Sequence, residues 1–385
     1  VWCTVCPMEL LTSLAARIGL RRKVPRFMKS GWVITIFYVL VVLVGLHALA
    51  IHRVPHRMAM YMLILLVAAA VIGLVFEKRA FCSYVCPVGH LLGLYAQCSV
   101  LEWRVADESV CDECKTKDCV AKKKWYNLFG HSCAINLYPP KIATNRDCLL
   151  CTHCLKVCPN DNLRLSVRRP FADFFRPLRL TAAQVGFVMI VSGFVVYEVL
   201  SEWAPSKEVV KWAPNEVVAA LGLTGPAAGF AGAVVMFVVF PAVMFLVVTI
   251  LATLIGRTPP AESAKAFALM LVPIMACAHF TKAIFKMTSR LPYWHLTLAD
   301  PKGVETANRI VAGTLTVDKS LPASLQPVTT LLATAAFATA LVVILVMFRR
   351  QASVARLPMG PRAVLLAGAL AYWAVFAVTI CLWRL

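Results

Sequence analysis

The sequence has 385 residues, of which 60% are hydrophobic, and its mean hydropathy is +0.75. This composition excludes an ordinary soluble globular protein and indicates a membrane protein. The formal net charge is +20. No nucleic-acid recognition module accompanies the basic residues, so we expect no nucleic-acid partner.

Seven apolar stretches are long enough to cross a bilayer as helices. They lie near residues 33–52, 58–76, 180–200, 227–256, 264–287, 329–348 and 363–383. The first two form a predicted N-terminal membrane hairpin over 1–104, and the last five a C-terminal membrane domain over 166–385. A small segment over 105–165 separates these two parts. We therefore predict an all-α polytopic membrane protein with one insert outside the bilayer.

Two cysteine–proline motifs stand eighty residues apart: Trp2-Cys3-Thr-Val-Cys6-Pro7 and Phe81-Cys82-Ser-Tyr-Val-Cys86-Pro87. Proline after a cysteine suits the first turn of a helix, where the positive end of the helix dipole favours a thiolate. Two predicted crossings separate the motifs, so both lie on one face of the membrane. We expect a shared metal or further cluster at Cys3, Cys6, Cys82 and Cys86. The alternatives are two buried helix starts or two separate redox thiol pairs.

The first motif opens at Val1, and no secretory signal precedes it in the sequence. We therefore expect a processed or partial chain.

The insert carries the run C-x2-C-x2-C-x3-C-P, over residues 148–159, that is typical of bacterial ferredoxins. In such runs the first three cysteines bind one [4Fe–4S] cube, and the fourth binds another. Further cysteines stand at 111, 114, 119 and 133. We therefore predict a ferredoxin-like insert with two cubes, one held by Cys111, Cys114, Cys119 and Cys158, and the other by Cys133, Cys148, Cys151 and Cys154.

Zinc and disulfides are the alternatives for these eight cysteines. Zinc sites usually combine two Cys pairs or Cys/His pairs, which this run does not match. His131 and His153 stand among the cysteines. Eight thiols already suffice for two cubes, so we expect both histidines beside the clusters or at the surface.

The fifth predicted crossing contains ionisable residues, which usually face a protein interior or a watery cavity. His279 and Lys282 follow Pro273 on this otherwise apolar stretch, and His47 lies near the outer end of the first crossing. A quinol site needs a proton acceptor, and histidine titrates in a suitable range. Three hypotheses stay open: a quinone site, a haem b held by His47 and His279, and a purely structural role. We expect haem least.

Basic residues indicate the orientation, because cytoplasmic loops retain Lys and Arg. They gather before the first crossing, in the insert and its exit, and between the last two crossings, as at Arg22, Lys123, Arg168 and Arg350. Counting crossings places all these regions on one side. We therefore predict cytoplasmic clusters, with 201–226 and 288–328 on the opposite face. A reducing compartment also agrees with fifteen cysteines that bind metal or stay buried as thiols.

Residues 1–180 resemble the NosR/NapH/CcoG group of membrane polyferredoxins. The resemblance lies in the motif ending Cys86-Pro87 and in the two-cluster segment that follows it. The first motif departs from the group in having two residues between Cys3 and Cys6, and the last five crossings have no counterpart. The resemblance implies electron transfer in anaerobic respiration or in copper-linked oxidase assembly.

From these observations we predict an iron–sulfur electron-transfer subunit of a respiratory complex in the bacterial inner (cytoplasmic) membrane. It would pass electrons between the quinone pool and other redox subunits, and it need not be an enzyme alone, because the cubes do no bond chemistry of their own. One alternative is a protein that reduces or handles copper or another metal through the cysteine–proline pairs. Another is a membrane anchor whose clusters are structural.

Overall fold

The computed structural model describes residues 2–127 and 130–384, and almost all its regular structure is helical. Within these described residues, six helical segments are long and apolar enough to cross a membrane. They are Pro55–Val75 (α5), Ala182–Leu200 (α10), Gly225–Gly256 (α12 and α13), Pro260–Ala299 (α14 and α15), Gln326–Arg350 (α18) and Met359–Arg384 (α20). The predicted class, an all-α polytopic membrane protein with a small insert, is confirmed.

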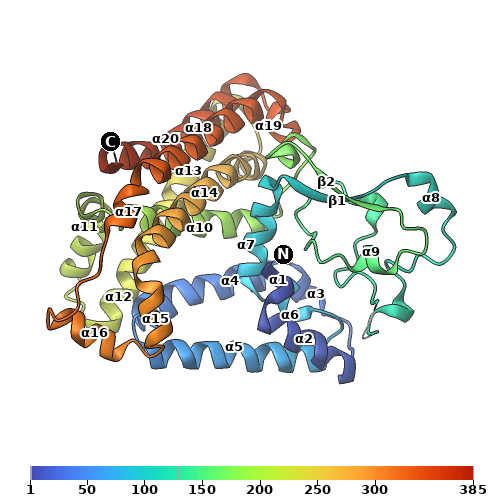
Figure 1. The fold of residues 1–385 in the computed structure, drawn as a ribbon. Helices are drawn as coiled ribbons and strands as arrows, with labels where there is room; N and C mark the ends of the chain where they lie inside the picture. The colour runs from blue at the N-terminus through green and yellow to red at the C-terminus, as the bar shows by residue number, and fades with distance from the viewer. Residues whose placement is uncertain (1, 128–129, 385) are drawn as a thin grey trace.

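The first expected crossing, 33–52, differs from the other six. It consists of α4 (Trp32–Leu40) and a π-helical continuation, η1 (Val41–Ala48), which together make a helix of only 17 residues. At about 1.5 Å per residue such a helix is roughly 26 Å long, slightly less than the bilayer core. Residues 49–54 connect it to α5 (Figure 1), whose main packing partners are α2 and α6.

The C-terminal half packs around α14 (Pro260–Arg290), which contacts α10, α13, α18 and α20. Residues 266–272 of α14 are almost fully buried on every side, which explains why this stretch of the helix is apolar all round. Two further segments, α12 (Gly225–Val234) and α13 (Phe240–Gly256), are joined by a second π-helical turn, η6 (Val235–Val239). These helices form the body from which the insert projects at one end (Figure 1).

The N-terminal helices lie beside this body, at its insert end. They are α1 (Trp2–Val5), α2 (Pro7–Ile18), α3 (Arg26–Lys29), α6 (Ala80–Tyr84) and α7 (Pro87–Tyr95). Helix α2 packs closely on α5 at Gly73, where an added Cβ would lie 2.7 Å from the carbonyl oxygen of Thr12. This close approach holds the first cysteine–proline motif near the second.

The insert is built on a two-stranded antiparallel sheet, β1 (Leu101–Val105) and β2 (Leu163–Val167). Leu101 pairs with Val167 at one end of the sheet, and Val105 pairs with Leu163 at the other. Two short helices, α8 (Glu108–Glu113) and α9 (His153–Val157), lie in the loops beyond the second end. Because the strands bracket residues 106–162, the sheet closes the cysteine-rich loops into one unit.

A buried ion pair joins the insert to the membrane body. Asp173 is fully buried, accepts hydrogen bonds from the Arg168 guanidinium, and accepts a third from the Asn145 backbone N–H at 2.7 Å. Gln351, after α18, donates to the Arg176 carbonyl at 3.0 Å. Residues 168–176, which lead from the insert into the membrane body, are thus hydrogen-bonded both to the cysteine loops and to the segment between the last two spans.

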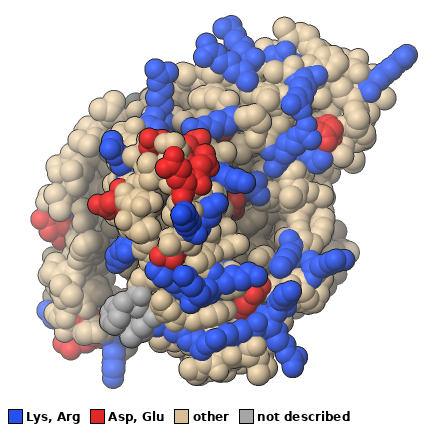
Figure 2. Space-filling model, turned by 90° about the vertical axis from the view of Figure 1, so that its right-hand side faces the viewer, with Lys and Arg blue, Asp and Glu red and all other residues tan. Residues whose placement is uncertain are grey.

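The ends of the spans divide between two faces. The insert and the short α19 (Ala352–Ala355) lie at one end of the molecule, whereas α11 (Ala204–Ala220), α16 (Val304–Val311) and α17 (Ser320–Ser324) lie at the other (Figure 1). Figure 2 views the insert end, where Lys and Arg spread over most of the face and Asp and Glu gather in fewer places. The basic regions singled out in the sequence therefore share one face.

Candidate iron–sulfur sites

Four cysteines of the insert line one cavity, and we call them the outer set: Cys111, Cys114, Cys119 and Cys158. Cys111 lies in the last turn of α8, and Cys114 follows as its C-cap. Burial, followed by the negative charge of the other three thiolates, raises the pKa of Cys119 to about 11. The four thiols therefore face a common space, although Cys158 lies far along the chain from the others.

Amide groups surround the sulfurs of the outer set. The Asn162 side-chain N–H donates to Cys111 Sγ at 3.3 Å, and the Asn162 backbone N–H donates to Cys158 Sγ at 3.5 Å. The Thr116 hydroxyl lies 3.7 Å from Cys114 Sγ. Such donors stabilise sulfur that carries negative charge.

The second set, the inner set, lines an adjacent cavity that is otherwise mostly apolar: Cys133, Cys148, Cys151 and Cys154. Burial, followed by the charges of the other three thiolates, raises the pKa of Cys154 to about 12. The Leu137 backbone N–H donates to Cys133 Sγ at 3.3 Å.

The loops that hold both sets adopt an uncommon backbone conformation. Non-glycine residues with positive φ are rare, yet five follow cysteines of these sets by one to three positions: Lys117, Asn136, Leu150, Thr152 and Asp161. Turns of this kind direct successive backbone N–H groups toward one anionic centre. The donor set and the loop geometry thus fit thiolate-held cubes.

The two cavities are neighbours, because Pro139 and Leu163 line both. Helix α9 spans the boundary between them, since it contains Cys154 of the inner set and ends at Cys158 of the outer set. The short helix that contains the third cysteine of the run therefore places the fourth cysteine, its C-cap, in the other cavity.

The two cysteine–proline motifs supply four more cysteines, which we call the third set: Cys3, Cys6, Cys82 and Cys86. Cys6 and Cys86 are the N-cap residues of α2 and α7, and Cys86 Sγ accepts from the Gly89 N–H at 3.4 Å. Burial raises the pKa of Cys86, and the thiolates of Cys3 and Cys6 contribute to this increase. Cys82 in turn lies within the electrostatic reach of Cys86.

The spacing within the outer and inner sets suits a cluster better than a single ion. Among residues 2–127 and 130–384, no group of three or more His, Cys, Asp or Glu side chains is close enough to hold one metal ion. A cube binds each cysteine at a different iron, so its ligands surround a space. The described thiols surround cavities in this way at the inner and outer sets.

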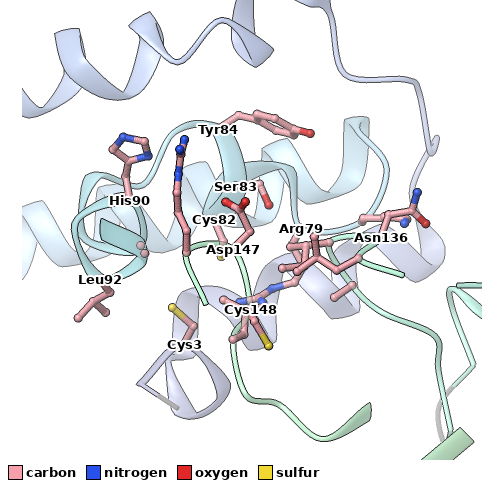
Figure 3. A pocket seen from close by; sticks show the side chains of 18 of the residues that line it. Cys3, Arg79, Cys82, Ser83, Tyr84, His90, Leu92, Asn136, Asp147 and Cys148 are labelled. Atoms are coloured by element: carbon pink, nitrogen blue, oxygen red, sulfur yellow. The ribbon is translucent and has the colours of Figure 1, made fainter. Parts of the chain in front are cut away.

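A larger cavity of about 700 Å³ lies between the insert and the membrane helices. It is lined by Cys3 and Cys82 of the third set and by Cys148 of the inner set, and Figure 3 shows these residues around it. Cys148 also lines the inner cavity. The outer, inner and third sets therefore follow one another from the tip of the insert to the membrane.

The structure separates the three intramembrane residues. His279 Nδ1 lies 2.7 Å from the Tyr95 hydroxyl, at the end of α7. Lys282 forms an ion pair with Glu198 and a longer one with Glu202 at 3.7 Å. These contacts give His279 and Lys282 different partners.

His47 lies elsewhere, in a cavity of about 470 Å³ formed by η1, α10, α11 and the α12–η6 segment. Its ring contacts Phe237 and Tyr197, with centroids 4.7 and 5.4 Å apart. Glu198, the partner of Lys282, also lines this cavity, whereas His279 does not. The three residues therefore do not line one common cavity.

Sequence reasoning missed two polar residues at these sites, Tyr95 and Arg79. Arg79 is 5% exposed and pairs with Glu9 at 3.0 Å. A charged residue so close before Cys82 is a visible signal, but its partner lies seventy positions earlier and cannot be chosen from the sequence.

His131 and His153, which we expected beside the clusters or at the surface, stack with ring centroids 3.6 Å apart, and neither lines the cysteine cavities.

Comparison with known proteins agrees with this geometry. Residues 58–105, which include Cys82 and Cys86, match a family described as a 4Fe-4S binding domain. The chain is 26% identical over 168 residues to an uncharacterized protein of Methanocaldococcus jannaschii, covering 42% of this chain and 62% of that protein. No solved structure matches.

Two further relatives are the ferredoxin-type proteins NapH of Escherichia coli and Haemophilus influenzae. Each is 26% identical, over 105 and 110 residues respectively, covering 27% of this chain and 36% of the relative. The chain thus matches less than two thirds of the length of each relative. The expected resemblance to NapH-like polyferredoxins is confirmed, and with it the class of an iron–sulfur electron-transfer protein of the membrane.

Proposed function

We propose that this NapH-like iron–sulfur protein carries electrons between the quinone pool and a redox partner, as a subunit of a respiratory complex in the bacterial inner membrane. One observation carries the proposal: the outer and inner cysteine cavities share wall residues, and Cys148 of the inner cavity also lines the cavity that contains Cys3 and Cys82. Electron transfer needs such closely spaced sites. A structural anchor does not need them in a row.

We assign the ligands of the outer and inner sets by cavity, and those of the third set by the two cysteine–proline motifs. Cys111, Cys114, Cys119 and Cys158 would hold one [4Fe–4S] cube, and Cys133, Cys148, Cys151 and Cys154 the other. Cys3, Cys6, Cys82 and Cys86 would hold a further cluster. The family match over 58–105 favours a cluster there over copper, because that family is described by its 4Fe-4S binding.

When bound, each cube accepts and releases one electron at a time. The chain supplies the surroundings that this requires. Pro139 and Leu163 stand between the outer and inner cavities and keep the wall between them apolar. The backbone and side-chain N–H groups of Asn162 stabilise the sulfurs of the outer set. The basic face of Figure 2 suits loops retained in the cytoplasm.

For quinol oxidation we propose His279 as the proton acceptor among the three intramembrane residues. Its hydrogen-bond partner Tyr95 ends α7, the helix that begins at Cys86 of the third set. A proton and an electron could therefore leave the quinol near one another. His47 lies in a separate cavity, and Lys282 is already paired with glutamates.

Anaerobic purification followed by iron and sulfide analysis tests the proposal. Three cubes require about twelve irons per chain and two require about eight. A reduced quinol analogue should then reduce the clusters, and His279→Ala should slow this reduction while leaving the iron content unchanged. Protein with full iron content that no quinol reduces would refute the quinone assignment, and an absence of iron would refute the electron-transfer role itself.

A further inference from the structure

Arg79 is a buried cation at the junction of two cysteine sets. It is the N-cap residue of α6, three positions before Cys82, and its side chain is 5% exposed. Its Nε pairs at 3.0 Å with Glu9 of α2, three positions after Cys6. The pair therefore links the two cysteine–proline motifs across seventy positions of sequence.

Part of the guanidinium group has no protein partner. Nη2 is buried and makes no hydrogen bond to any residue within 2–127 and 130–384. Burying a charged donor without a partner costs considerable free energy. Arg79 lines the large cavity together with Cys3, Cys82 and Cys148 (Figure 3). A group bound in that cavity could accept a hydrogen bond from the unused Nη2 donor.

Arg79 adjoins both neighbouring sets. It is the N-cap residue of the helix that contains Cys82, and it lines the large cavity together with Cys82. Cys148 of the inner set lines the same cavity. None of the outer-set cysteines lines this cavity, and Arg79 does not line theirs.

We infer that Arg79 sets the reduction potentials of the two clusters that flank it, those of the third and inner sets, through its positive charge and its unused N–H donor. This inference rests on the proposed ligand assignment. Adding an electron to a cluster adds negative charge, which a fixed nearby cation stabilises. Glu9 opposes part of this effect and holds the guanidinium in place.

The sign of the shift separates this role from a structural one. Arg79→Gln removes a positive charge and should lower the potentials of the inner and third clusters. Glu9→Gln removes a negative charge from the same pair and should raise them. If the pair only fastened α2 to α6, both variants would loosen the same contact and change the clusters in the same direction.

The experiment is a potentiometric titration of the anaerobically purified full chain in detergent, followed by EPR. We expect Arg79→Gln to weaken reduction of the inner cluster at least tenfold, which is about 59 mV for one electron, and to leave the outer cluster unchanged. Arg79→Lys should shift the potential less, because it keeps the charge and loses the planar donor group. Arg22→Gln, which removes an exposed cation near the same face, is the matched control and should shift nothing.

Equal shifts of all clusters, or shifts of the same sign in Arg79→Gln and Glu9→Gln, would overturn the inference. Should Arg79→Gln fail to fold, the upward shift expected for Glu9→Gln still decides the matter. Wild-type protein without iron would refute the proposed function, whereas full iron content with unchanged potentials in these variants would refute only the role of Arg79.

Discussion

The side-chain amide of Asn162 donates a hydrogen bond to the sulfur of Cys111 at 3.3 Å. The same side chain accepts from the Asp107 backbone N–H at 3.0 Å and donates to the Asp107 carbonyl. One buried residue therefore fixes both the start of α8 and a sulfur of the outer set.

Asn162→Ala should destabilise the protein by about 1–3 kcal/mol, because two partly buried hydrogen bonds to the Asp107 backbone are lost. It should also lower the reduction potential of the outer cluster alone. Asn162→Asp keeps the acceptor and adds a negative charge, so in this variant the reduction potential of the outer cluster should fall further. Chemical denaturation and EPR-monitored titration measure the two effects, and a potential that rises in either variant would contradict this account.

Cys158→Ser should damage the cluster of the outer set and spare that of the inner set, although Cys154 is the nearer neighbour in sequence. The reason is the position of Cys158 in the outer cavity. Iron analysis and the EPR signal of the remaining cluster report the outcome. Cys381→Ser, at an exposed cysteine in α20, is the control and should retain both clusters. Loss of the inner cluster instead would show that the ligand pairing is wrong.

Asp173→Asn should cost up to about 3–5 kcal/mol, because the buried Arg168 guanidinium loses its nearer charge partner and keeps Glu102 at 3.6 Å. Asn145, which donates its N–H to Asp173, precedes Cys148 by three residues. We therefore also expect a broadened EPR signal from the inner cluster. Asp161→Asn is a suitable control, since Asp161 is exposed and its positive φ favours asparagine. Unfolding in detergent measures the difference, and equal stabilities of the two variants would exclude a joint at Asp173.

Lys282→Met should destabilise the membrane body, because Glu198 loses its ion-pair partner and Glu202 keeps only Lys286. Adding Glu198→Gln should restore much of the loss, as expected when an uncompensated charge is the cause. Lys265→Met breaks a more exposed pair with Glu262 and should cost no more than about 1 kcal/mol. Thermal unfolding compares the three, and a double variant no more stable than Lys282→Met would rule out the charge explanation.

Reporter fusions test the predicted orientation. A fusion after Arg350 should report the cytoplasm, and one near Asp300 or Lys319 the opposite side. Arg350 ends α18 beside α19, whereas Asp300 and Lys319 precede α16 and α17, which lie at the other end of the molecule (Figure 1). The reverse result at both points would show that the protein has the opposite orientation in the membrane. The same result at both would show that no crossing separates them.

The class of fold followed from local composition, because long apolar stretches carry their signal within one segment. The exception is residues 33–52, where an apolar run gives no sign that its second half winds as a π-helix. The helix α11 was also absent from the prediction for 201–226. It contains prolines at 205 and 214 and several charges, which made its helical character hard to recognise.

The candidate sites were predictable to different degrees. Spacing within 148–159 suggested two cysteine groups, and the cavities contain the same two groupings, while the ligand roles remain predictions. The contacts Arg79–Glu9 and Tyr95–His279 join distant segments. They depend on how α2 packs on α5 and how α7 meets α14, which no local pattern reveals.

The packing of α2 on α5 at Gly73 also bears on how the protein is made. Cys3 and Cys6 can approach Cys82 and Cys86 only after the ribosome has delivered both apolar segments of the hairpin to the membrane. If these four cysteines hold the proposed cluster, its assembly must follow insertion of the hairpin. The inner and outer sets are complete once Cys158 has been synthesised, when the last five spans are still to come. Cofactor assembly can thus begin on a nascent chain whose membrane body does not yet exist.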